Sequence, residues 1–271
     1  MTYLPGDREE RAPDSNRKNE TYYKENAIVA DESKRASQPD GEKKVPQWGM
    51  AIDLDRCTGC EACVVACHAE NNIPLSDEES TARGHANHWI RIDRYYEGEF
   101  PNIKVKYRPV MCQHCDDAPC EPVCPTFATY QNAEGLNVQV HSRCIGTRYC
   151  ANNCPYTVRF FNWSEPVWPE SLQLQLNPDV SIRSGGVMEK CTFCIQRIQR
   201  GKQDAAAEGR ELADGDVQPA CVQSCPAEAM AFGDLSDPES KVSRWAGSGR
   251  STQLLGELGT KPRVFYLERA E

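Results

Sequence analysis

Residues 144–155 read Cys144-Ile-Gly-Thr147-Arg-Tyr-Cys150-Ala-Asn-Asn-Cys154-Pro155, and this stretch decides how the rest of the chain is interpreted. Its cysteines are spaced like those of the group that begins at Cys57, except that threonine stands at position 147 instead of a second cysteine. The 15 cysteines of the chain fall into four groups, of which the third is one member short. The groups are Cys57, Cys60, Cys63, Cys67; Cys112, Cys115, Cys120, Cys124; Cys144, Cys150, Cys154; and Cys191, Cys194, Cys221, Cys225.

Three kinds of site use many cysteines. Disulfide scaffolds are one, but the odd count and the repeated C-x2-C spacing argue against them. Zinc ribbons are another, but they need two distant pairs, without a third cysteine close by and a fourth followed by proline. Iron–sulfur clusters are the third, and the bacterial spacing C-x2-C-x2-C-x3-C-P matches this sequence. We therefore predict iron–sulfur clusters and keep a zinc-stabilised scaffold as the alternative from another class.

The residue after each fourth cysteine supports this interpretation in three groups out of four. Proline follows Cys124, Cys154 and Cys225, where its fixed φ turns the chain. The first group differs, because His68 follows Cys67. We interpret His68 as a hydrogen-bond donor and not as a ligand.

In paired clusters the fourth cysteine of one group ligates the cluster of the other group. The sequence alone permits several pairings. Groups two and three are neighbours in the sequence, so we pair them. Groups one and four must then pair across the whole fold. The predicted ligand sets are Cys57, Cys60, Cys63 and Cys225; Cys67, Cys191, Cys194 and Cys221; Cys112, Cys115, Cys120 and Cys154; and Cys124, Cys144 and Cys150, with Thr147 at the missing-ligand position.

The missing cysteine changes the predicted cofactor of the last set. A hydroxyl is a poor ligand for a soft metal, so Thr147 is not expected to replace the thiolate. A cubane with three thiolates tends to lose the unligated iron. We therefore predict three [4Fe-4S] clusters and one [3Fe-4S] cluster. The alternative is a four-iron cluster with water or the threonine oxygen on its fourth iron.

The cysteine groups divide the chain into three parts. Residues 1–46 are polar and charged, which predicts a flexible or partner-wrapping arm. Residues 47–235 carry all the cysteines and are predicted to form the four-cluster domain, and residues 236–271 a C-terminal extension. The predicted fold class is α+β, with two pseudo-symmetric bacterial 2[4Fe-4S] ferredoxin-like units, short strands, loop insertions and extended termini.

Hydrophobic periodicity places the expected elements around the cysteines. Strands are predicted at 50–54, 88–95, 103–107, 135–140 and 263–267, and a helix over 191–211. Residues 69–87 and 163–187 are predicted surface insertions, because they are polar or interrupted by proline and glycine.

Composition excludes several classes of function. The chain has 271 residues with a formal net charge of -9, which argues against nucleic acid as a partner. No stretch reaches the roughly 18 apolar residues of a membrane span. The first residues are charged and lack an apolar core, so no signal peptide is expected. Nothing in the sequence is typical of a nucleophile–base pair, a phosphate loop or a flavin site, so we predict no catalytic residues.

Several charged and aromatic residues lie beside the cysteines. We interpret Arg143, Arg148 and Lys190 as solvated or structural charges, with a raised cluster potential or pairing with a partner's carboxylate as the alternatives. We interpret His114 as a structural packing residue, with donation to a cluster sulfide or an approach to the membrane subunit as the alternatives. Trp163 is interpreted as a core residue and not as an electron relay.

Four cysteine groups, with the third short of a ligand and the fourth stretched, resemble the iron–sulfur subunits of the complex iron–sulfur molybdoenzyme family. The resemblance covers roughly residues 47–235. It is nearest to the iron–sulfur module of alternative complex III and of the Qrc menaquinone reductase complex. The strings that carry it are Trp48-Gly-Met-Ala-Ile-Asp-Leu-Asp-Arg-Cys57-Thr-Gly-Cys60, Cys67-His-Ala-Glu-Asn-Asn-Ile-Pro74, Met111-Cys-Gln-His-Cys115, Gly146-Thr-Arg-Tyr-Cys-Ala-Asn-Asn-Cys-Pro-Tyr156 and Gly186-Val-Met-Glu-Lys-Cys191.

The resemblance implies an electron-transfer subunit of a membrane-bound, quinone-linked respiratory complex. It implies a molybdopterin-fold large subunit, a polysulfide-reductase-type integral membrane subunit with the quinone site, and multiheme cytochrome c subunits as partners. It places the three-iron cluster toward the quinone, and the complex on the outer, periplasmic face of the cytoplasmic membrane, with this chain exported by a signal-bearing partner. The alternative within the same family is the electron-transfer subunit of a true molybdoenzyme, such as a polysulfide, tetrathionate or nitrate-type reductase.

Overall fold

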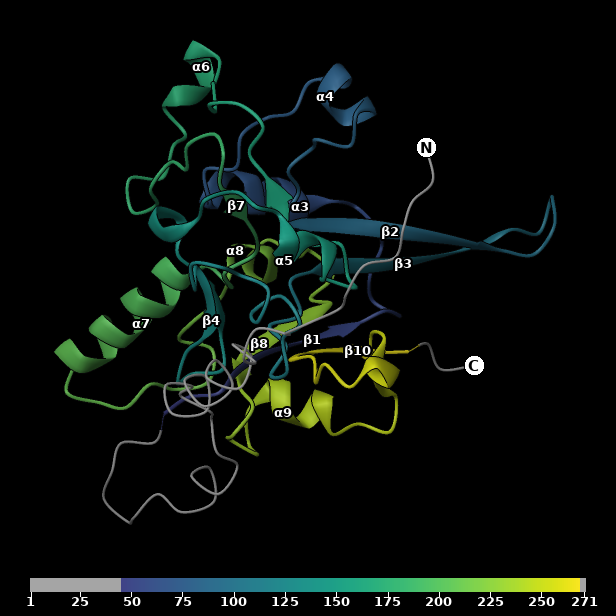
Figure 1. The fold of residues 1–271 in the computed structure, drawn as a ribbon. Helices are drawn as coiled ribbons and strands as arrows, with labels where there is room; N and C mark the ends of the chain where they lie inside the picture. Colours follow the sequence, from purple (N-terminus) through teal and green to yellow (C-terminus); the bar gives the residue numbers. More distant parts are fainter. Residues whose placement is uncertain (1–44, 269–271) are drawn as a thin grey trace, which may run out of the picture. The chain divides into compact units, whose positions relative to one another are not determined.

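A mixed four-stranded sheet joins the two ends of the described chain, residues 45–268 of a computed structural model (Figure 1). In order across the sheet the strands are β8 (Met230–Asp234), β1 (Trp48–Asp53), β10 (Val264–Leu267) and β9 (Ser251–Gln253). β1 pairs antiparallel with β8 and parallel with β10, so Met50 lies opposite both Phe232 and Val264. Every residue of β1 is buried, as expected for a central strand that is covered on both faces.

The C-terminal part of the chain belongs to this sheet. The strands predicted at 50–54 and 263–267 are confirmed as β1 and β10. The predicted C-terminal extension, 236–271, is described up to residue 268 and also supplies β9 and the helix α9 (Lys241–Ala246), whose Val242 is fully buried. The predicted N-terminal arm, 1–46, lies almost entirely outside the described residues.

A long antiparallel hairpin projects from the body at the right of Figure 1. It consists of β2 (Ile90–Glu97) and β3 (Lys104–Met111), paired from Ile90 with Met111 to Glu97 with Lys104. Both strands were predicted, at 88–95 and 103–107. Ile90 and Ile92 near the base are buried, whereas Phe100 at the tip is 89% exposed.

Two smaller hairpins surround the third cysteine group. They are β4 (Thr129–Gln131) with β5 (Asn137–Gln139), and β6 (Phe160–Phe161) with β7 (Met188–Glu189). β5 confirms the strand predicted at 135–140. The region 163–187 is mostly loop, as predicted, and its helix is α6 (Glu170–Gln173). The prediction of a surface insertion at 69–87 is wrong at its beginning, because Asn71, Asn72 and Ile73 are buried.

The helices are short, and several start directly at the cysteine groups. The helix predicted at 191–211 is observed as α7 (Ile195–Ala207). The other elements are α3 (Ala62–Glu70), α4 (Glu78–Ala82), α5 (Tyr149–Asn152), α8 (Ala220–Gln223) and the 3-10 turns η1 (His141–Arg143) and η2 (Gly256–Leu258). The mixture of helix and strand confirms the α+β class.

Aromatic side chains link the sheet to the cysteine groups. The Trp48 and Phe232 rings stack at 5.3 Å between β1 and β8. Phe193 packs edge-on against Phe232 at 5.2 Å and stacks on His114 at 4.0 Å. The hydrophobic core continues through most of the cysteine side chains themselves.

Candidate functional site

The first and third cysteine groups have the same backbone conformation. Gly59 and Gly146 both have left-handed φ, 69° and 73°, and a Cβ on either would lie 2.4 Å from a neighbouring atom. Each glycine precedes the second ligand position of its loop, which is Cys60 in one group and Thr147 in the other. Thr147 therefore stands in the structural place of a cysteine.

The loop conformation extends to the residue after that position. Glu61 and Arg148 both have left-handed φ, 63° and 61°, and each is the N-cap of the helix that follows. In the other two groups the residue before the second cysteine, His114 or Phe193, also has positive φ. The four groups thus share a loop that bends the chain around a central point.

The first set of thiols comes from the two ends of the cysteine-bearing region. The neighbours that act electrostatically on the Cys63 thiol are Cys57, Cys225 and Cys60. Burial, together with these neighbours, raises the pKa of Cys63 to about 12. Cys60 is exposed, and hydrogen bonds from the Ala62 backbone and from Thr58 lower the pKa of its thiol.

The second set is the most deeply buried. The electrostatic neighbours of the Cys67 thiol are Cys191, Cys194 and Cys221, and all four side chains are buried. Burial raises the pKa of Cys67 well above its ordinary value. The sulfur atoms of Cys67 and Cys194 each lie 3.6 Å from Nδ2 of Asn71, which can donate to both.

The third set joins the second and third cysteine groups. The Cys115 thiol has Cys112, Cys120 and Cys154 as neighbours, and burial raises its pKa to about 12. Cys112, Cys115 and Cys120 are buried, and Cys154 is half-buried. Thiols of groups two and three therefore lie together in this set, and their ligation of one cluster stays a prediction.

The fourth set has three thiols and Thr147. Cys144 and Cys124 are electrostatic neighbours of Cys150, and all three line a small hollow together with Thr147. Thr147 itself is exposed and also lines a larger cavity with Trp163. The structure thus brings the predicted missing-ligand position to the same hollow as the three thiols.

Backbone N–H groups point at these sulfurs. Ala128 N lies 3.2 Å from Cys124 Sγ, and Ala229 N lies 3.4 Å from Cys225 Sγ, each four residues after its cysteine. Further donors are Met188 N to Cys144 Sγ at 3.3 Å, Phe193 N to Cys191 Sγ at 3.4 Å and Ala220 N to Cys194 Sγ at 3.5 Å. All fifteen cysteines are free thiols. Sulfur with amide donors is the environment that stabilises thiolates bound to iron, so these residues fit iron–sulfur clusters.

Within residues 45–268, no three His, Cys, Asp or Glu side chains converge closely enough to hold one ion. The zinc alternative therefore gains no support from the thiol geometry of the described residues.

Successive thiol sets are neighbours, in the order first, second, third and fourth. Cys63 of the first set is an electrostatic neighbour of Cys221 of the second, and Cys112 of the third is a neighbour of Cys191 of the second. Arg159 lies beside thiols of both the third and the fourth set. The two middle sets are largely buried, whereas the outer sets reach the surface, at Cys60 in one and at Thr147 in the other.

The other residues that the sequence analysis named lie close to these sets. His68 Nε2 lies 3.0 Å from Nδ1 of His88, and burial, followed by the charge on His88, lowers the pKa of His68 to about 4. His114 is fully buried, and its Nδ1 accepts a hydrogen bond from the Asn137 backbone at 3.1 Å. Arg143 is exposed.

One of these interpretations is wrong and another is narrowed to a single case. Trp163 is not in the core, because it is half exposed, stacks on His85 at 4.1 Å and lies under the Arg148 guanidinium. Lys190 is the structural case of its interpretation, because it is 1% exposed and donates to backbone carbonyls of Asn137 and Cys191.

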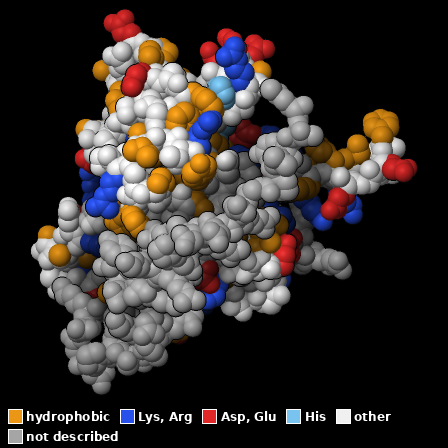
Figure 2. Space-filling model, in the orientation of Figure 1, with side chains coloured by type: hydrophobic (Ala, Val, Ile, Leu, Met, Phe, Trp, Pro, Cys, Tyr) orange, Lys and Arg blue, Asp and Glu red, His pale blue; other side chains and the backbone are white. Residues whose placement is uncertain are grey.

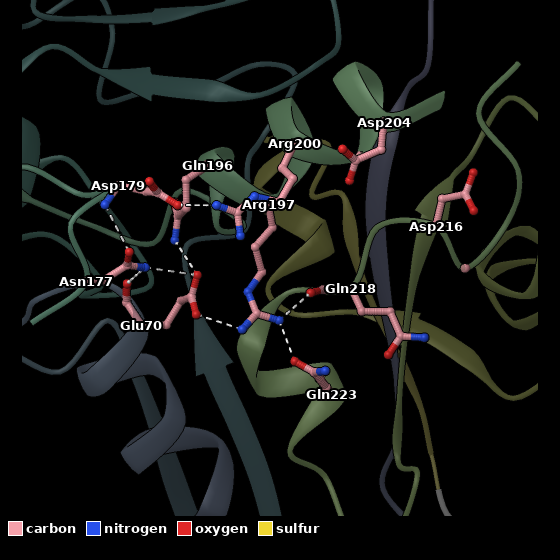
Figure 3. A pocket seen from close by; sticks show the side chains of 12 residues that line it. Glu70, Asn177, Asp179, Gln196, Arg197, Arg200, Asp204, Asp216, Gln218 and Gln223 are labelled. Carbon is pink, nitrogen blue, oxygen red and sulfur yellow. Dashed lines mark hydrogen bonds and ion pairs between the residues drawn. The ribbon is translucent and has the colours of Figure 1, made fainter. Parts of the chain in front are cut away.

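A polar cavity of about 530 Å³ lies next to the second set, between α3 and α7 (Figure 3). Arg197 donates to Glu70 at 2.6 Å and to the carbonyl of Gln218 at 3.0 Å. Burial opposes ionisation of Glu70, but hydrogen bonds from Arg197 and Gln196 lower its pKa. Arg200 pairs with Asp179 across the same cavity. The Arg197–Glu70 ion pair therefore joins α7 to α3 at this cavity.

Sequence reasoning missed two residues that contact the sets, Asn71 and Arg159. Asn71 follows Cys67 by four residues, which is one helical turn, so the spacing is a usable signal. No spacing in the sequence predicts the position of Arg159. Its hydrogen-bond partners lie on β4 and β5, far from it in the sequence, and only the fold brings them together.

Comparison with known proteins agrees with this geometry. Residues 56–128 and 103–170 each match a family described as a 4Fe-4S dicluster domain. The iron–sulfur cluster-binding subunit of menaquinone reductase from Nitratidesulfovibrio vulgaris is 47% identical over 83% of this chain and 90% of its own length. Iron–sulfur subunit 1 of the Hdr-like menaquinol oxidoreductase of Archaeoglobus fulgidus is 37% identical over 84% and 86%. A subunit of the tetrathionate reductase of Salmonella typhimurium is 33% identical over 82% and 72%.

The fold and the thiol sets define an iron–sulfur protein built from two ferredoxin-type dicluster units, as predicted. More particularly, the chain belongs to the iron–sulfur subunits of the complex iron–sulfur molybdoenzyme family. No helix among residues 45–268 combines the length and the apolar composition that crossing a bilayer requires.

Proposed function

We propose that the chain is the electron-transfer subunit of a membrane-associated, quinone-linked oxidoreductase complex. The observation that carries this proposal is the succession of four neighbouring thiol sets. The middle two sets are largely buried, and the first and fourth reach the surface. Clusters bound at these sets would give electrons one path through the protein, from a partner at one end to a partner at the other. The names of relatives, menaquinone reductase and menaquinol oxidoreductase among them, support the quinone link.

The four sets are proposed to hold four clusters with the crossed ligation predicted from the sequence. Cys57, Cys60, Cys63 and Cys225 would hold the first; Cys67, Cys191, Cys194 and Cys221 the second; and Cys112, Cys115, Cys120 and Cys154 the third. The clusters supply one-electron redox chemistry when bound. The protein's part is to space them, to exclude water from the middle two and to donate N–H groups to their sulfurs.

The fourth set is proposed to hold a three-iron cluster. Cys124, Cys144 and Cys150 supply three thiolates, and Thr147 stands in the place of the fourth ligand. A hydroxyl ligates iron in a soft sulfur site poorly, which favours loss of that iron. The first three sets, each with four cysteines, would then carry [4Fe-4S] clusters.

Exposed apolar side chains mark two surfaces for partners. Ile145, Tyr149 and Trp163 surround Thr147, and Figure 2 shows hydrophobic side chains gathered over α5. A second group follows the projecting hairpin to Phe100 at its tip (Figure 2). Exposed apolar patches of this kind are typical of interaction sites. We propose the first surface for the membrane quinone subunit, with a molybdopterin-fold large subunit, and multiheme cytochromes c, toward the first cluster. The complex is proposed to face the periplasm.

A second candidate is the electron-transfer subunit of a true molybdoenzyme. Its support is the 33% identity to the tetrathionate reductase relative. The two candidates differ in the large subunit, so molybdenum analysis of the isolated complex separates them.

Low-temperature EPR of the isolated complex, as prepared and after dithionite reduction, tests the proposed cofactors. We expect one oxidised three-iron signal that disappears on reduction, together with signals of three reduced four-iron clusters. Iron and sulfide analysis of the same sample gives the total content. Four reduced four-iron clusters and no oxidised signal would contradict the three-iron assignment. Absence of iron, with zinc in its place, would overturn the proposed function.

A further inference from the structure

Arg159 is a buried cation that donates to three neutral side chains and also hydrogen-bonds the Cys150 thiol of the fourth set. It is 6% exposed and precedes β6. Its Nη1 donates to Thr129 Oγ1 at 3.1 Å and to Gln139 Oε1 at 2.9 Å, and its Nη2 donates to Asn137 Oδ1 at 2.7 Å. No carboxylate of residues 45–268 forms an ion pair with Arg159. The Glu121 carboxylate accepts a hydrogen bond from Asn137 and not from Arg159, and burial raises the pKa of Glu121. Burying an uncompensated charge is costly, so the guanidinium requires a negative neighbour of another kind.

The hydrogen bonds hold the guanidinium between two thiol sets. Thr129 and Gln139, which fix Nη1, line the same hollow as the three thiols of the fourth set. Asn137 Oδ1, which fixes Nη2, lies 3.9 Å from Cys120 Sγ of the third set. Cys120 and Cys112 of the third set and Cys150 of the fourth are electrostatic neighbours of the Arg159 charge. Three neutral side chains and the Cys150 thiol therefore fix the guanidinium, and its positive charge lies beside thiols of both sets.

We propose that Arg159 is the counter-charge shared by the third and fourth clusters and that it raises the reduction potentials of both together. The inference rests on the proposed function. Each cluster becomes more negative when it accepts an electron, and a fixed cation in a water-poor site stabilises that form. Because one charge serves both clusters, its removal shifts both potentials in the same direction and changes the difference between them less.

Gln139 provides a way to cancel the charge without removing the arginine. Gln139→Glu keeps the size of the side chain and its contact with Arg159 Nη1, and it places a carboxylate where a neutral oxygen now accepts. The guanidinium stays in position, but its charge is paired inside the protein. Arg159→Gln removes the charge outright, and Arg159→Lys keeps the charge while it loses the planar fork.

The experiment is a redox titration of the intact complex, with the signal of each cluster followed by EPR. Arg83→Gln, an exposed charge removal of the same size, is the matched control. At the wild-type midpoints we expect the ratio of reduced to oxidised third and fourth clusters to fall at least tenfold in Arg159→Gln, which is about 59 mV for a one-electron couple. Gln139→Glu should shift both ratios in the same direction, whereas Arg159→Lys and Arg83→Gln should stay within about threefold of wild type.

Each outcome decides the matter. If Arg159→Gln loses its cluster signals, its potentials cannot be measured. The potentials of Gln139→Glu then test the proposal, because that variant retains the arginine. Unchanged potentials in Gln139→Glu, or a shift confined to one cluster, would overturn the shared role. A wild-type complex with fewer than four clusters would instead overturn the proposed function. EPR of the wild type shows this before any variant is compared.

Discussion

Asn71 Nδ2 lies 3.6 Å from Cys194 Sγ, although 123 residues separate the two in the sequence. The same Nδ2 atom lies 3.6 Å from Cys67 Sγ, so one amide serves two ligands of the proposed second cluster. Gln196 donates to Asn71 Oδ1 at 3.2 Å and fixes which way the amide faces.

Replacement of Asn71 by leucine is expected to lower the potential of the second cluster and leave the others unchanged. A reduced cluster carries more negative charge on its sulfurs, so it accepts these hydrogen bonds more strongly than the oxidised form. The expected shift is a few tens of mV, and about 59 mV corresponds to a tenfold change in the redox equilibrium. EPR redox titration measures it. Asn152→Leu, at an exposed position, is the control.

Thr147→Cys is expected to convert the fourth cluster from three irons to four. The Thr147 backbone has the same surroundings as Cys60, with a left-handed glycine before it and a left-handed residue after it, so a thiolate there needs no rearrangement. The oxidised three-iron signal should disappear and the iron content should rise by one atom per chain. Thr147→Ser, which has no thiol, should retain the signal. If the cysteine variant also retains it, position 147 does not face the fourth iron of the cluster.

Arg183 and Glu189 form a buried bidentate ion pair, with side chains 2% and 0% exposed. Glu189 also accepts hydrogen bonds from Trp89 and Asn162. Arg183→Met leaves a buried carboxylate without its cation, which is expected to cost about 3–5 kcal/mol. Loss of cluster absorbance in denaturant should then occur at a clearly lower concentration than in wild type. Removal of the exposed Arg83–Glu79 pair should cost less than about 1 kcal/mol.

Alkylation of the iron-stripped chain is expected to begin at Cys60. Its thiol is exposed, and backbone and Thr58 hydrogen bonds lower its pKa, so it has more reactive thiolate at neutral pH. Burial raises the pKa of Cys63 and Cys115 to about 12, so these should react slowly while the fold persists. Peptide mass spectrometry at short times measures the order. Equal rates at all cysteines would show that the metal-free chain does not keep this fold.

Termination of the chain after Lys261 is expected to prevent cluster binding. It removes β10, which pairs with the buried strand β1, and it removes the fully buried Val264 and Tyr266. Burial of two such side chains contributes several kcal/mol by area. Iron content of the purified complex measures the effect. A truncated chain with full iron content would mean that the sheet and the thiol sets are independent.

Local signals in the sequence predict the cysteine loops but not the residues that surround them. Cysteine spacing and a following proline are local signals, so the loops and the place of Thr147 could be predicted from them. The pairing of groups one and four could only be reached by elimination, because Cys57 and Cys225 are brought together by strand pairing across the whole chain.

The positions of Lys190, Trp163 and Arg159 could not be predicted for a related reason. Lys190 is buried because its ammonium reaches two backbone carbonyls, one of them on β5, and no periodic pattern reveals such a contact. Trp163 is exposed because His85 and Arg148 provide its contacts at the surface. The strand at 263–267 was recognisable, but its place beside β1 was not, since pairing partners are not encoded in a strand's own pattern.

The interleaving of the thiol sets has a consequence for how the protein is made. The third and fourth sets are complete once the ribosome has added Cys154, but the second waits for Cys221 and the first for Cys225. A nascent chain can therefore mature its middle portion while Cys57, Cys60 and Cys63 remain exposed to oxidants and stray metals. Maturation would then finish at the first set, which takes its thiols from both ends of the cysteine-bearing region.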